Sequence, residues 1–149
     1  MLISRRHASS ALWVSLGALL ACGWLFAGEP GYAVPTTWTG TTSNVWSTGV
    51  GTNWSAGYSD GDDVTFNDTG LNTNITISGT VIPGSITFDN SIAYSLTSGI
   101  ISGAANIVHN GSGTTTINST NNITGKTFLN GGILSINADA RLGTAPGSP

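Results

Sequence analysis

The sequence predicts an all-β protein built as a parallel β-solenoid, which should be right-handed by the general rule for parallel crossovers. Two observations carry the prediction of a solenoid. First, Thr, Ser, Asn and Gly make up 65 of the 116 residues from Val34 to Pro149, a segment without Glu or Gln. Strong helix formers are scarce there, whereas Thr fits pleated strands and Asn and Gly fit corners. Second, short apolar–Thr–apolar triplets alternate with such corners, as expected for short strands with one buried face.

The triplets set the expected register. Val64–Phe66, Ile75–Ile77 and Ile86–Phe88 follow one another at intervals of eleven residues. Period-two alternation places one set of side chains in the core: Ile75, Ile77, Ile86, Phe88, Leu134 and Ile136. Thr76, Thr87 and Ser135 should then point outward. A β-sandwich is the competing architecture. We favour the solenoid because the strands are short and polar corner residues can stack in ladders, with about 20 residues per rung and roughly five to six rungs.

Residues 1–33 have the layout of a secretory signal peptide, expected to be helical. Arg5 and Arg6 precede an apolar run over residues 11–27, and Gly31-Tyr32-Ala33 places small residues at the −3 and −1 positions of a cut before Val34. The alternatives are an uncleaved membrane anchor, a twin-arginine signal, and a lipoprotein box ending at Cys22. The last fits less well, because the apolar run continues past the cysteine. We expect cleavage after Ala33 and export to the outside or to the outer cell surface.

Residues 34–63 form a Trp-rich N-terminal region that precedes the regular triplets. Trp38, Trp46 and Trp54 recur at intervals of eight residues, which keeps them on one face if the strands are regular. They either form a hydrophobic cap over the open first rung or an aromatic platform for sugar rings. We favour the cap, because large aromatic residues are usually packing residues.

The polar residues do not combine into a catalytic or metal site. Asp60, Asp62 and Asp63 fit no calcium-loop spacing, so we interpret the segment as a solvated turn that opens a strand at Val64. His109 has no second His, Cys or Glu after residue 33 to work with. We therefore expect no catalysis, cofactor or metal. The weakly acidic balance also argues against nucleic-acid binding, which needs a basic patch.

Residues 111–143 contain strands and corners that follow a specific order. The pattern consists of Gly111, Gly113, Thr115, Ile117, Asn121, Ile123, Thr124, Gly125, Thr127, Leu129, Gly132, Leu134, Ile136, Leu142 and Gly143. It resembles the autotransporter-associated β-strand repeat, also called the passenger-associated transport repeat. Asn122, Ile123 and Lys126 depart from that family by replacing its usual Thr, Tyr and Gly.

The resemblance implies a right-handed surface β-solenoid of a Gram-negative-type bacterium. The strand pattern extends the expected solenoid over residues 64–143, followed by a tail over residues 144–149. Either the sequence is a fragment of a longer passenger, or the chain acts alone or through a separate partner. The partners that the resemblance implies are the export machinery, an outer-membrane translocator or further repeats. We therefore expect an exported structural or adhesive passenger segment. The first alternative is a secreted carbohydrate-binding module that binds surface glycans through the three tryptophans. A remnant of a β-helix carbohydrate-active enzyme is disfavoured by the small supply of carboxylates.

Overall fold

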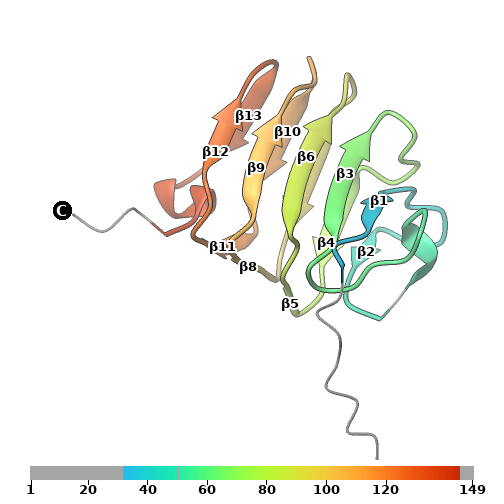
Figure 1. The fold of residues 1–149 in the computed structure, drawn as a ribbon. Helices are drawn as coiled ribbons and strands as arrows, with labels where there is room; N and C mark the ends of the chain where they lie inside the picture. The colour runs from blue at the N-terminus through green and yellow to red at the C-terminus, as the bar shows by residue number, and fades with distance from the viewer. Residues whose placement is uncertain (1–31, 50, 145–149) are drawn as a thin grey trace, which may run out of the picture.

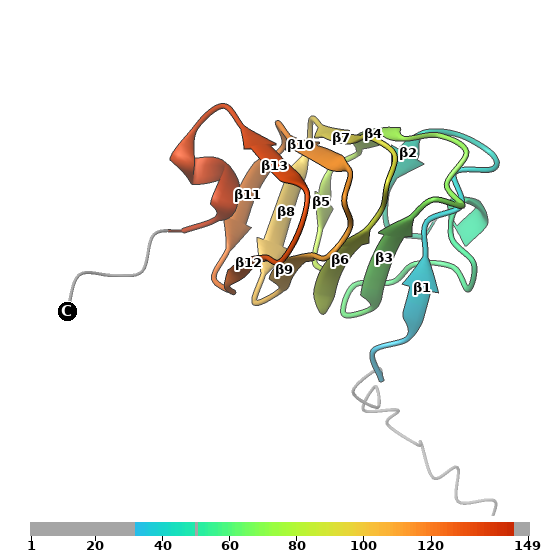
Figure 2. The ribbon, with the colours of Figure 1, turned by 90° about the horizontal axis from the view of Figure 1, so that it is seen from above.

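The protein is a β-solenoid of parallel stacked coils with about four turns, as seen in a computed structural model (Figure 1). The structure describes residues 32–49 and 51–144. In this part of the chain no helix is long and apolar enough to cross a membrane. The predicted signal-peptide helix and the tail beyond Thr144 lie outside the described residues. The ends of the described chain lie at opposite ends of the stack (Figure 2).

The chain visits three sheets in turn, and every pairing between named strands is parallel. The first sheet contains, in stacking order, β1 (Pro35–Thr37), β3 (Asp63–Asn67), β6 (Ser85–Asp89), β9 (Asn106–His109) and β12 (Thr127–Leu129). The second contains β2 (Val45–Trp46), β4 (Asn74–Ile77), β7 (Tyr94–Thr97), β10 (Thr114–Ile117) and β13 (Ile133–Ile136). The third contains β5 (Thr80–Val81), β8 (Ile100–Gly103) and β11 (Thr120–Ile123). Two short 3-10 helices complete the described chain, η1 (Gly51–Asn53) and η2 (Asp139–Leu142).

The strand register agrees with the rung length that the sequence predicts. Asp63 of β3 pairs with Ser85 of β6, and Ser85 pairs in turn with Asn106 of β9. The eleven-residue interval between triplets is therefore half a rung. It places Val64–Phe66 and Ile75–Ile77 on different sheets, whereas Ile86–Phe88 stacks directly on Val64–Phe66.

The expectation of five to six rungs was too high, because the structure has about four turns. The excess came from dividing the whole chain after residue 33 by a constant rung length. Pro35 pairs with Asp63, so the first coil is longer than the coils that follow it. Residues 47–49 and 51–62 form η1, turns and isolated bridges rather than further rungs, and they place Trp54 and Tyr58 in the core.

The inward and outward faces follow the predicted alternation. Ile75, Ile77, Ile86 and Phe88 are buried in one continuous hydrophobic core. Leu134 and Ile136 pack against that core but are only partly buried, because they lie on the last strand of their sheet. Thr76 and Thr87 are partly exposed and Ser135 is exposed, so the predicted register is confirmed on both faces.

We expect Ile77→Ala to lower the free energy of unfolding by about 2–5 kcal/mol, because it leaves a cavity in a closely packed coil. Thr76→Ala, on the outer face of the same strand, should change it by only a few tenths of a kcal/mol. Thr76 receives one hydrogen bond, from the Asn44 side-chain amide at 3.3 Å, and this contact is exposed. Urea melts of the two variants test the register. Equal effects, or a larger effect at Thr76, would contradict it.

Candidate functional site

The three tryptophans of the N-terminal region meet in the core at the first end of the stack. The exposed fractions of Trp38, Trp46 and Trp54 are 0%, 0% and 4%. The ring centroids of Trp38 and Trp54 lie 5.1 Å apart, and those of Trp46 and Trp54 lie 5.4 Å apart, both in edge-to-face geometry. Phe66 of β3 lies beneath them, with its ring 5.6 Å from that of Trp46. The tryptophans therefore close the hydrophobic core of the solenoid.

This burial argues against the glycan platform predicted as an alternative for Trp38, Trp46 and Trp54. Stacking on a sugar needs a ring face open to solvent, and these rings face one another and Phe66. All three rings reach the same core, but they do not lie on one regular strand, because turns and η1 lie between Trp46 and Trp54. They are buried because the end of a parallel stack exposes apolar core, which three large rings cover efficiently.

The aspartates at the corners connect successive coils, so their interpretation as members of a solvated turn was incomplete. Asp60 does lie in a turn, but its carboxylate accepts the Ile82 N–H at 2.8 Å. The Asp63 carboxylate accepts the Ser85 hydroxyl at 2.6 Å. In both pairs the two residues are 22 positions apart in the sequence, which is the length of one rung and could have predicted the contacts.

Asp68 makes the same kind of contact at the next corner, where its carboxylate accepts the Ser91 hydroxyl at 2.6 Å and the Ser91 N–H at 2.7 Å. These hydrogen bonds, first that of the hydroxyl, hold the pKa of Asp68 below its usual value. Burial, followed by the nearby negative charge of Asp68, raises the pKa of Tyr94 to about 12. The Tyr94 hydroxyl donates to the Asn67 carbonyl at 2.6 Å, so it acts as a structural donor at this corner.

Asp62 differs from the other corner aspartates because its side chain is buried, with 7% of its surface exposed. Its two carboxylate oxygens accept the N–H of Val34 at 3.0 Å and the N–H of Ser59 at 2.7 Å.

In residues 32–49 and 51–144, no three His, Cys, Asp or Glu side chains lie close enough together to hold a metal ion.

His109 lies in the core, with none of its surface exposed. Its Nε2 atom is 3.1 Å from the Thr115 hydroxyl. Its ring stacks on that of Phe88 in the preceding coil, at a centroid distance of 5.9 Å. Register pairs Phe66 with Phe88 and Phe88 with His109, so His109 continues an aromatic ladder along the stack. His109 therefore has a packing role, which could not be predicted from the residues next to it in the sequence because Phe88 lies in another coil.

The predicted repeat, residues 111–143, covers more than one and a half coils, since Thr114 pairs with Ile133 and Ile100 with Thr120. It contains β10, β11, β12, β13 and η2. Of its named residues, Ile117 is buried, Leu134 and Ile136 pack partly buried on the core, and the Asn121 amide donates to the Arg141 carbonyl. Gly111, Gly113, Gly132 and Gly143 occupy corners where an added Cβ would meet the previous coil. Thr124 donates its N–H to the Gly103 carbonyl at 2.9 Å, which continues the ladder of β11 and β8.

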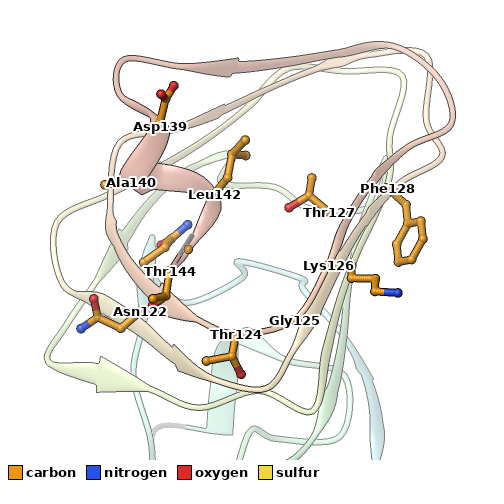
Figure 3. Close-up of a pocket in the computed structure, with 12 residues that line it drawn as sticks. Asn122, Thr124, Gly125, Lys126, Thr127, Phe128, Asp139, Ala140, Leu142 and Thr144 are labelled. Atoms are coloured by element: carbon orange, nitrogen blue, oxygen red, sulfur yellow. The ribbon is translucent and has the colours of Figure 1, made fainter. Parts of the chain in front are cut away.

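The C-terminal end of the described stack is open. The strands β12 and β13 each pair with one neighbour only, so their outer edges carry unpaired backbone groups. A hollow of about 1140 Å³ opens at this end between β11, β12 and η2. In Figure 3, Leu142 and Thr127 point into the coil, whereas Phe128 and Lys126 lie outside it. Leu129 and Ile133 are more than half exposed here, at 55% and 59%.

Of the three described sheets, the third alone is closed at this end. η2 folds beneath β11, where the Thr144 N–H donates to the Ile123 carbonyl at 2.9 Å. The Arg141 guanidinium reaches back to the Ser119 carbonyl at 2.8 Å. The segment around Gly143 therefore takes the place that the next strand of the third sheet would occupy. The two ends of the described stack thus differ, since one is covered by aromatic rings and the other leaves two sheets open.

The geometry defines a scaffold of stacked coils with one closed end and one open end. Comparison with protein-family models, with curated proteins and with solved structures gives no match to this chain.

Proposed function

We propose that the protein is an exported, non-enzymatic surface scaffold, a passenger-type β-solenoid segment whose open end is extended by further rungs. The observation that carries this proposal is the difference between the two ends of the stack. Trp38, Trp46 and Trp54 cover one end, where Ser55 and Asn53 also hydrogen-bond to the outer edges of β1 and β2. At the other end, β12 and β13 present free edges and exposed apolar side chains. Natural sheets usually protect such edges, so a free edge beside an exposed core marks a place where more strands add.

The proposal includes the hand of the coil, the route of export and an adhesive or structural role. Parallel strands joined through crossovers are right-handed in nearly all proteins, which supports a right-handed coil. The order of residues in the leader supports export and cleavage before Val34. The outward faces of the strands are rich in Thr and Ser, which suits a solvated surface that makes many weak polar contacts.

We expect export to produce a chain that begins with Val34. Expression of the full chain in a Gram-negative host, followed by fractionation and N-terminal sequencing, tests this outcome. A matched control replaces Leu19 and Leu20 by Arg, which interrupts the apolar run and should leave a full-length chain in the cytoplasm. A full-length wild-type chain in the cytoplasm would contradict the export proposal. A lipid-modified Cys22 at the N-terminus would instead place the protein on a membrane anchor.

We expect the open end to accept a further coil of the same kind. Insertion of a second copy of residues 124–143, which is one coil in length, after Gly143 should raise the melting temperature and keep a single cooperative transition, because the new coil buries the edges of β12 and β13. The control is a Gly/Ser insert of equal length, which should leave the melting temperature unchanged or lower. A second copy that melts separately, or that behaves like the Gly/Ser insert, would contradict extension at this end.

A further inference from the structure

Asp62 is a buried carboxylate beside the backbone nitrogen of Val34. The distance from the Val34 nitrogen to the Asp62 Oδ1 atom is 3.0 Å, and these residues are separated by 28 positions in the sequence. The other carboxylate oxygen accepts the Ser59 N–H at 2.7 Å, so both oxygens have one neutral donor. A buried carboxylate is costly unless it is paired with a positive charge, and neither of these donors carries one.

The cap contains no side chain that could supply a positive charge. Residues 32–62 include no Lys, Arg or His. The described Lys126 and Arg141 lie at the opposite end of the stack, where they belong to the β11–β12 corner and η2. Asp60 and Asp63 add two further negative charges within one or two positions of Asp62. The cap therefore carries three carboxylates and no side-chain cation.

Val34 is held in place from both sides. Its N–H donates to Asp62, and its carbonyl accepts the N–H of Asp63 at 3.2 Å. The preceding Tyr32 is 91% exposed, so the chain leaves the fold before Val34. A recess of about 390 Å³ borders Val34 and Asp62, with Tyr58 and Asp60 on its wall. Removal of the residues before Val34 would thus leave its nitrogen at the same carboxylate, with room for water.

We propose that Asp62 is the binding site for the α-ammonium group that cleavage before Val34 creates, so that processing completes an ion pair and stabilises the cap. Water adds across the Ala33–Val34 peptide bond, which gives a carboxylate on Ala33 and an ammonium group on Val34. The hydrogen bond from Val34 to the Asp62 carboxylate then joins two charged groups, so the ammonium donor adds an ion pair to a bond in which only the acceptor was charged. This inference rests on the proposed cleavage position and adds a partner for the new terminus.

The experiment compares two chains that both begin at Val34, one with a charged α-amino group and one with an acetylated, neutral one. A chain that begins at Val34 is released from a fused carrier by a protease, so the comparison does not depend on export. Residues 34–149 contain every strand of the described solenoid. Lys126→Arg removes the one lysine after residue 33, which leaves the α-amino group as the only amine. Acetylation of that amine then restores a neutral amide N–H, as in the unprocessed chain, and removes only the charge.

We expect acetylation to lower the melting temperature at pH 6.5 by about 4 °C in the chain with Asp62. In the matched Asp62→Asn variant, acetylation should change it by less than about 1 °C. The interaction is present below the α-amino pKa of the unfolded chain, which is about 7.7–8.0. It is lost as the pH rises through the higher folded pKa, so the effect of acetylation should vanish near pH 10.

Asp60, Asp63 and Tyr58 are the other titratable groups close to the site. Tyr58 remains neutral over this range of pH, because burial, followed by the nearby negative charge of Asp60, raises its pKa. The two aspartates are present in both the free and the acetylated chain. The difference between these chains therefore isolates the charge on the α-amino group.

A second measurement applies if Asp62→Asn does not fold. The α-amino group of the folded chain should react with an acylating reagent at pH 7.5 about five- to tenfold more slowly than in urea, because the ion pair keeps it protonated. The effect of urea on the reagent is corrected with a model peptide. Equal acylation rates of the α-amino group in the folded chain and in urea, after this correction, would overturn the proposal. An equal effect of acetylation in the Asp62→Asn variant would overturn it as well. If the exported protein begins elsewhere but these effects hold, the site stands and the proposed cleavage position fails.

Discussion

Trp46→Ala should lower the free energy of unfolding by about 3–5 kcal/mol. Trp46 has none of its surface exposed, and its ring contacts those of Trp54, Tyr58 and Phe66 at centroid distances of 5.4–5.6 Å. Its removal leaves a cavity between the cap and the first stacked coil, and the surrounding strands can close it only in part. Denaturant melts measure the effect.

The matched control is Trp46→Phe, which keeps an aromatic ring and should cost much less. The Trp46 Nε1 atom is buried and has no hydrogen-bond partner among the described residues, so its loss removes no bond. Trp38→Phe should cost more than Trp46→Phe, because the Trp38 Nε1 atom donates to the Asn72 carbonyl at 2.7 Å. A small effect of Trp46→Ala, or a response of its fluorescence to added polysaccharide in the native state, would argue for an exposed ring instead of a cap.

Gly125→Ala should lower the free energy of unfolding by about 3 kcal/mol, or prevent folding of the last coils. A Cβ atom at Gly125 would overlap the carbonyl oxygen and the carbonyl carbon of Ala105. These atoms belong to the backbone of the previous coil, so no side-chain rotation can make room. The two coils would have to separate at this corner, with loss of the pairing between β12 and β9.

Gly79→Ala serves as the comparison, because a Cβ there meets no atom within 4 Å. Its φ angle is +77°, so the substitution should cost about 1–2 kcal/mol through backbone strain alone. Thermal melts of the two variants separate contact between coils from conformational strain. If Gly125→Ala cost no more than Gly79→Ala, the repeat glycine at this corner would not be explained by the close approach of two backbones.

Much of the fold was accessible from local patterns. The alternation in Ile75–Ile77 and Ile86–Phe88 predicted the buried face, because a strand has a period of two and one side of each strand lines the core. The corner residues predicted short strands. The preference of large rings for packing correctly favoured burial of the three tryptophans, whereas their interval of eight did not place them on one strand, because η1 and turns lie between Trp46 and Trp54.

The candidate site was harder to predict, because it depends on contacts between coils. Asp60 and Asp63 were assigned to a solvated turn, since Asp and Gly are common turn residues, yet they bind groups 22 positions away. His109 appeared isolated, yet it stacks on Phe88 in the coil beneath. The number of turns was overestimated because one rung length was applied to the Trp-rich region.

The sequence by itself determined that the chain forms short strands with an apolar and a Thr-rich face, because composition and period-two alternation act locally along the chain. The tertiary structure decided which residues meet, because the register of each coil on the next brings together groups that lie one rung apart in the sequence. That register brings Val34 to Asp62 and Gly125 to Ala105, and leaves the edges of β12 and β13 free. Local propensity carries no information about such contacts, since they arise only when the coils stack.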